Sequence, residues 1–179
     1  MLERQHTLTS TLIGHDSNGN PQSDTKRSEL GELVFRLKNR NDRKALAPIA
    51  EAAVEFVQRW SPKVDVVVPV PPSHRRTYQP VVEIAKAIAR LLRQPVDLTA
   101  IVKSKQTPEL KDVFGFDERT AALQGAFKVN EKSVQGKRIL LVDDLYRSGA
   151  TASIVARTLM SGGAASVHML AMTKTRTGT

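Results

Sequence analysis

Two adjacent carboxylates stand just before a run of small and hydroxyl-bearing residues in the last third of the sequence. The run from 142 to 151 reads VDDLYRSGAT, with Asp143 and Asp144 as the acid pair. Carboxylates this close make each other harder to ionise, so they suit a ligand that supplies hydroxyl donors or a cation. The next residues place N–H groups, hydroxyls and a guanidinium at the start of an expected helix, which favours an anion: Arg147, Ser148, Gly149, Ala150 and Thr151. A ribose 5-phosphate group, with vicinal hydroxyls and a phosphate, fits both halves.

Other interpretations of an acid pair are less consistent with the whole pattern. Two aspartates alone can solvate the end of a strand or cap a turn. A receiver domain carries its acid pair near its beginning, whereas only 36 residues follow Asp143 here. Neither GxxxxGK[ST], the phosphate-binding loop, nor GxGxxG, the dinucleotide-binding turn, occurs in the sequence. The combination of strand, acid pair, SGAT and helix therefore favours a ligand site.

The elements around the acid pair form a strand, loop, helix and strand. The apolar run 138–142 predicts a strand, 143–149 a loop, 150–160 a helix ended by two glycines, and 167–172 a second strand. Strands joined in this way lie parallel, with a right-handed crossover. We therefore expect an α/β fold, a mainly parallel twisted sheet flanked by helices, with the site at the carboxyl ends of its strands.

The rest of the chain supplies further elements of the same kind. Ser28 and Asp42 are expected to cap helices, and Pro48 is compatible only with a first helical turn. Residues 1–27 are expected to form an extension or small hood, and residues 28–179 the main domain. The patterns predict strands at 7–13, 64–70, 98–102 and 126–129, and helices at 29–37, 46–60, 79–93 and 117–123.

Composition limits the classes of partner and site. The 179 residues include 27 Lys and Arg against 18 Asp and Glu, a net charge of +9 that suits a phosphate-rich partner. The absence of cysteine excludes disulfides, thiol nucleophiles and cysteine-bound metals. Aromatic residues make up only 4%, which leaves few stacking surfaces for nucleic acid. No apolar run approaches the length of a membrane span and the start lacks a signal-peptide pattern, so we expect a soluble cytoplasmic protein without membrane contact.

Several sequence blocks resemble one enzyme family. Residues 139–151, ILLVDDLYRSGAT, resemble the phosphoribosyl pyrophosphate signature of type I phosphoribosyltransferases, and this thirteen-residue match is specific. Four weaker blocks resemble the ComF-like branch of that family, in the same order, so the resemblance covers about residues 28–173: VVVPVPPSHRR at 66–76, TPELK at 107–111, ERTAALQGAFK at 118–128 and GKRILLVDD at 136–144.

The resemblance implies a reaction and a role for each part of the site. Such enzymes transfer a phosphoribosyl group from phosphoribosyl pyrophosphate to a nitrogen nucleophile, unidentified here, with Mg²⁺ bridging the pyrophosphate and ribose hydroxyls; many are homodimers. Asp143 and Asp144 would hold the ribose hydroxyls and meet Mg²⁺ only through these hydroxyls or water, while 147–151 would bind the 5-phosphate. A pyrophosphate loop is implied at Val70, Pro71, Pro72, Ser73, His74 and Arg75. A mobile loop is implied at 103–116, and the charge candidates around the site are Arg76, Lys103, Lys105 and Arg119.

The sequence also departs from the family pattern. Tyr146 replaces an aliphatic residue, Arg147 replaces a small or hydroxyl-bearing one, and the pyrophosphate loop lacks glycine. The cysteine zinc module that often precedes ComF-like domains has no cysteines to form it here. An alternative function therefore stays open: a non-catalytic module that binds phosphoribosyl pyrophosphate or a nucleotide, with a link to nucleic-acid processes. The basic cluster 36–44 is the candidate nucleic-acid contact, although such charge runs more often face solvent.

Overall fold

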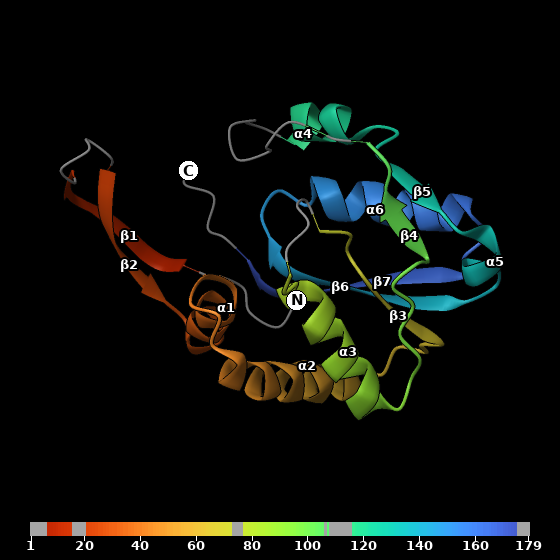
Figure 1. Ribbon diagram of the computed structural model, residues 1–179, viewed down its shortest axis with the longest axis horizontal. Helices are drawn as coiled ribbons and strands as arrows, with labels where there is room; N and C mark the ends of the chain where they lie inside the picture. The colour runs from red at the N-terminus through yellow and green to blue at the C-terminus, as the bar shows by residue number, and fades with distance from the viewer. Residues whose placement is uncertain (1–6, 16–20, 73–76, 106, 108–115, 175–179) are drawn as a thin grey trace.

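The centre of the fold is a parallel sheet of three strands in the order β3-β6-β7. The computed structural model describes residues 7–15, 21–72, 77–105, 107 and 116–174 (Figure 1). The sheet strands are β3 at Val66–Pro69, β6 at Arg138–Tyr146 and β7 at Ser166–Lys174. Ile139 of β6 pairs with Val66 on one side and Val167 on the other, both in parallel register. The apolar runs of β3 and β6 are buried, as expected for strands covered on both faces. The predicted α/β fold is confirmed.

Helices cover both faces of this sheet (Figure 1). On one face lie α1 at Glu29–Asn39, α2 at Leu46–Trp60 and α3 at Pro80–Leu92. On the other face lies α6 at Ala150–Ser161. Because successive strand residues point to opposite faces, Leu140 and Val142 join the core beneath α1–α3, whereas Ile139 and Leu141 join the core beneath α6.

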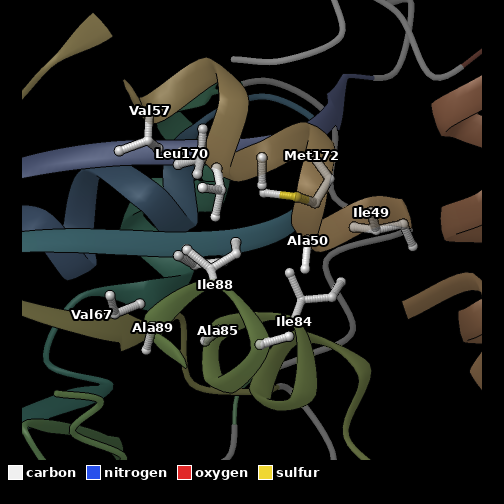
Figure 2. Close-up of a cluster of buried hydrophobic side chains, with 14 of the residues drawn as sticks. Ile49, Ala50, Val57, Val67, Ile84, Ala85, Ile88, Ala89, Leu170 and Met172 are labelled. Atoms are coloured by element: carbon white, nitrogen blue, oxygen red, sulfur yellow. The ribbon is translucent and has the colours of Figure 1, made fainter. Parts of the chain in front are cut away.

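The first of these cores is formed mainly by aliphatic side chains of α2, α3 and the sheet. Figure 2 shows Ile49 of α2 and Ile84 and Ile88 of α3 near Leu170 and Met172 of β7. All five side chains are fully buried. Burial of each such side chain contributes about 1.5–3 kcal/mol, so this cluster fixes α2 and α3 against the sheet.

Smaller elements lie around the central layers. β1 and β2 form an antiparallel hairpin, β4 and β5 form a second antiparallel pair, and α4 packs near α6. Their bounds, with those of two short helical segments, are Thr7–His15 for β1, Pro21–Arg27 for β2, Arg43–Ala45 for the 3-10 helix η1, Ile101–Lys103 for β4, Phe116–Leu123 for α4, Phe127–Val129 for β5 and Glu131–Val134 for α5. No helix in the described parts of the chain is long and apolar enough to cross a membrane.

Most predicted elements are present, with shifted ends. Ser28 caps α1, accepting a hydrogen bond from the Gly31 N–H at 3.1 Å, and Pro48 lies in the first turn of α2. Asp42 accepts a hydrogen bond from the Lys44 N–H and so caps η1, the short helix that directly precedes α2. Strand β2 and helix α5 were not predicted, and β4 begins at Ile101 instead of residue 98. The proposed division after residue 27 stays a prediction.

One difference changes the site. The sequence pattern predicts a loop from residue 143 to 149, but β6 continues through Tyr146. The continuation is held by β7, where Asp143 pairs with Ala171 and Leu145 with Thr173. A polar strand end is stable here because a neighbouring strand of equal length, nine residues, supplies its partners. The acid pair therefore lies in a strand.

Candidate functional site

The strand geometry divides the acid pair between two sides of the sheet. Asp143 follows Leu141 onto the α6 side and lines a cleft there. Asp144 follows Val142 onto the α1 side, where its Oδ2 lies 2.8 Å from the Lys38 Nζ. In the loop conformation expected from the sequence, both carboxylates would face one ligand. In the structure, Asp143 lines the cleft and Asp144 is bound by α1.

Asp143 is held in an environment that disfavours its charge. Its Oδ1 accepts a hydrogen bond from the Asp144 N–H at 2.9 Å. Burial, and next the negative charge of Asp144, raises the pKa of Asp143 to about 7, although Lys38 and the backbone hydrogen bonds act in the opposite direction. Hydrogen-bond donors from a ligand would stabilise the ionised form. Asp143 is therefore suited to accept hydroxyl hydrogens or to exchange a proton near neutral pH.

The cleft also contains the N-terminal end of α6. Gly149 caps this helix with φ of 82°, in the left-handed region that favours glycine. A Cβ at this position would lie 2.2 Å from the Tyr146 Oη, so the tyrosine occupies the space beside the glycine. The N–H groups of Thr151 and Ala152, in the first turn of α6, have no partner within the helix. This end of α6 therefore offers donors and a partial positive charge to an anion.

A cation from another element reaches the same cleft. Arg119 of α4 donates from Nη1 to the Ser148 Oγ at 3.4 Å, and the Ala150 N–H also points to this oxygen at 3.4 Å. The cleft has a volume of about 80 Å³, room for several waters or a phosphate group. The cleft lining includes all five residues of the predicted phosphate loop, 147–151. Its other members are Arg119, Asp143, Leu145, Tyr146 and Ala152.

The carboxyl end of β3 lies beside β6 at the residue just before Asp143. Pro69 is in register with Val142, and the Val70 N–H donates to the Val142 carbonyl at 2.8 Å. The predicted pyrophosphate loop begins at Val70, one residue after the pair of Pro69 and Val142, so its start lies beside Asp143. Val70, Pro71 and Pro72 are described, and the remaining loop candidates lie outside the described residues: Ser73, His74, Arg75 and the neighbouring charge candidate Arg76.

Known proteins resemble both the sequence and the fold. No model of a protein family matches the chain. The competence protein ComFC of Bacillus subtilis is 28% identical over 144 residues, which cover 79% of this chain and 58% of ComFC, so the chain spans little more than half of that relative.

Solved phosphoribosyltransferase structures share the architecture. Adenine phosphoribosyltransferase from Thermoanaerobacter pseudethanolicus matches with a TM-score of 0.54 and 15% identity over 93% of this chain and 82% of that one. Glutamine phosphoribosylpyrophosphate amidotransferase from B. subtilis, complexed with ADP and GMP, matches with a TM-score of 0.55 and 19% identity. The match covers 88% of this chain and 34% of the amidotransferase chain. The chain therefore has the type I phosphoribosyltransferase fold, and its sequence resembles ComFC.

The predicted charge candidates are distributed unevenly around the cleft. Arg119 is in the lining, as predicted for a residue near the site. Lys103 instead donates from Nζ to the Thr107 Oγ1 at 2.7 Å, and its burial lowers its pKa. Lys105 is exposed near Gly125, away from the lining. Most of the predicted mobile loop, residues 106 and 108–115, lies outside the described residues.

The predicted basic cluster is also divided by the fold. The Arg36 Nε donates to the Asp42 Oδ2 at 2.9 Å, Lys38 binds Asp144, and the Arg43 guanidinium lies 5.0 Å from the centre of the Tyr78 ring. The cluster therefore does not form one continuous patch of unpaired cations. Sequence reasoning did not place Lys38 at the site, although its position four residues after the buried Val34 sets it beside the core-facing stripe of α1.

Proposed function

We propose that this protein binds phosphoribosyl pyrophosphate with Mg²⁺ and transfers the phosphoribosyl group to a nitrogen nucleophile, releasing pyrophosphate. In this reaction the bond from ribose C1 to the pyrophosphate oxygen breaks and a C1–N bond forms, while the nucleophile loses a proton. The observation that carries the proposal is the presence of Asp143 and the first turn of α6 in one cleft. A carboxylate and an anion site so placed match the hydroxyl and phosphate ends of one sugar phosphate.

The phosphate end of the ligand would bind at the start of α6. The N–H groups after Gly149 and the Ser148 and Thr151 hydroxyls supply donors, and the Arg119 and Arg147 guanidiniums supply positive charge. All of these residues line the same cleft. Charged donors of this kind form shorter and stronger hydrogen bonds to phosphate than neutral ones.

The sugar end would bind at Asp143. This residue faces the cleft and would accept the ribose hydroxyl hydrogens, while Asp144, bound by Lys38 on the other side of the strand, would act through its N–H, which donates to the Asp143 Oδ1. The described residues contain no cluster of three or more His, Asp or Glu side chains that could hold a metal. The hard carboxylate oxygens of Asp143 would suit Mg²⁺ held through water or ribose hydroxyls, whereas Asp144 faces α1 and lies outside the cleft lining. When bound, Mg²⁺ would neutralise charge on the departing pyrophosphate.

Pyrophosphate would lie toward the loop that follows β3. Negative charge grows on this group as it departs, so oriented N–H groups and cations there lower the barrier. The Val70 N–H donates to the Val142 carbonyl, which would hold the start of this loop beside Asp143.

Calorimetry with phosphoribosyl pyrophosphate and Mg²⁺ tests the proposal. We expect wild-type protein to bind and Asp143→Asn to bind at least about tenfold more weakly, since a charged hydrogen-bond acceptor is worth roughly 1.5–3 kcal/mol. Glu51→Gln, an exposed carboxylate of α2, is the matched control and should bind like wild type. No heat of binding by the wild type would refute the proposal. Pyrophosphate release with nucleobases, glutamine and ammonia then identifies the acceptor.

A second candidate function is ligand binding without transfer. The observation that favours it is Tyr146, whose ring lies against Gly149 within the cleft and narrows the space where a reacting ligand must fit. Under this alternative the protein would act as a regulatory module, and the competence name of its ComFC relative would point to a process that involves nucleic acid. Binding of phosphoribosyl pyrophosphate without pyrophosphate release across the acceptor panel supports the alternative. Turnover with any acceptor removes it.

A further inference from the structure

Lys38 of α1 forms an ion pair with the carboxylate that follows the cleft-lining Asp143. The Lys38 Nζ lies 2.8 Å from the Asp144 Oδ2. The Asp144 side chain is only 13% exposed and that of Lys38 is 36% exposed, so the carboxylate is nearly enclosed while the cation keeps contact with solvent. The two residues belong to elements far apart in the sequence, and their contact ties the first helix to the end of the central strand.

The fold holds both partners of this pair in place. Val34 and Leu37 bury the same side of α1 against the sheet, which brings Lys38 to the edge of that interface. On the other side, the Thr173 hydroxyl donates to the Asp144 carbonyl at 3.2 Å, and Thr173 is fully buried. Asp144 is therefore held through its side chain by α1 and through its main chain by β7.

The surrounding charges make Lys38 the cation that compensates the acid pair on this side. On α1, Arg36 is bound to Asp42. On the opposite side of the strand, Arg119 of α4 and Arg147 line the cleft with Asp143, and Lys174 of β7 lies over the Tyr146 ring. Loss of Lys38 would leave a nearly enclosed carboxylate next to a second one. Such a group turns toward water or takes a proton.

We infer that Lys38 is a positioning residue for the sugar site: by binding Asp144 it fixes the end of β6, and thereby the Asp143 carboxylate, in the orientation that receives the ligand. The Asp144 N–H donates to the Asp143 Oδ1 at 2.9 Å. A shift of the backbone at residue 144 would therefore move the N–H group that orients the Asp143 carboxylate. The inference rests on the proposed function, because it assigns Lys38 to the same ligand. Lys38 acts through Asp144 and does not itself line the cleft.

Binding of ribose 5-phosphate, measured by calorimetry, tests this role in four variants of the full chain: Lys38→Met, Lys38→Arg, Asp144→Asn and the double variant Lys38→Met/Asp144→Asn. We expect Lys38→Met to weaken binding about tenfold or more, as is typical for residues that orient ligand-binding groups. Lys38→Arg keeps the charge and should recover most of the affinity. The double variant should bind no more weakly than Asp144→Asn alone, because Lys38 acts through that carboxylate.

A matched control separates positioning from general ion-pair loss. Lys86→Met on α3 removes an ion pair of the same length, 2.8 Å to the Glu83 Oε1, and should leave affinity unchanged. Urea unfolding confirms that each variant is folded in the binding assay. Wild-type affinity in Lys38→Met, failure of Lys38→Arg to restore binding, or additive losses in the double variant would overturn the inference. Absence of ribose 5-phosphate binding by the wild type would instead overturn the proposed function on which the inference rests.

Discussion

Replacement of Gly149 by alanine probes the contact between the phosphate loop and Tyr146. At φ of 82° a residue with a Cβ costs about 1–2 kcal/mol relative to glycine. The added Cβ would also lie 2.2 Å from the Tyr146 Oη and 2.6 Å from its Cζ, so the ring must rotate away. An off-rotamer side chain costs about 0.5–1.5 kcal/mol, which brings the expected loss in the free energy of unfolding to roughly 2–3 kcal/mol.

Urea unfolding and thermal melting measure this loss directly. For a chain of this size, each kcal/mol lowers the Tm by about 2–4 °C, so Gly149→Ala should melt roughly 4–12 °C below wild type. The double variant Gly149→Ala/Tyr146→Ala isolates the part of the lost unfolding free energy that comes from the clash with the Tyr146 ring. In the Tyr146→Ala background, the added methyl should cost only the backbone part, about 1–2 kcal/mol.

Gly136 provides the matched control for backbone strain. It also has a positive φ, 69°, but a Cβ there would meet no atom within 4 Å. Gly136→Ala should therefore lose only about 1–2 kcal/mol. If Gly149→Ala proves no more destabilising than Gly136→Ala, Tyr146 does not occupy the space beside the phosphate loop, and the argument that it narrows the cleft is refuted.

Two further predictions concern pH. The Arg138 side chain and N–H bind Asp65 and lower its pKa to about 2. The stability of the wild type should therefore fall as pH drops from about 4 toward 2. Urea titrations should show that Asp65→Asn loses less stability over this interval. Asp143 behaves oppositely: its raised pKa, about 7, means that its contribution to stability is present below about pH 4 and is lost as pH rises through 7. Asp143→Asn should therefore gain in urea midpoint relative to wild type between about pH 5 and pH 8, and a pH-independent difference would contradict the assigned burial.

The core of the fold was predictable because local patterns and tertiary contacts agree there. The run RILLV has the composition of a strand buried on both faces, and its residues do lie between two layers of helices. The glycines at 162 and 163 end α6 where expected. Ser28 caps α1 by the local hydrogen bond that its position predicts. In each case the signal lies within a few residues of the feature.

The missed features depend on residues far away in the sequence. Nothing local indicates that β6 continues through Asp143 and Tyr146, because the continuation requires β7 as a partner. Strand β2 is polar, PQSDTKR, and pairs only with β1 among the described strands, so it lacks the alternating apolar pattern of a half-buried strand. The role of Lys38 depends on a contact with a residue 106 positions later, which no periodicity reports.

The extension of β6 explains why two adjacent carboxylates can coexist at this site. In a loop, both side chains could turn toward the same cleft, and their mutual repulsion would then have to be relieved by the ligand alone. In a strand, the alternation of side chains separates them: Asp143 faces the end of α6 and Asp144 faces α1, where Lys38 compensates its charge. The cleft thus contains one carboxylate, available to the proposed ligand, and the fold supplies the cation for the other. A helix at the beginning of the chain is therefore part of the site that the acid pair forms.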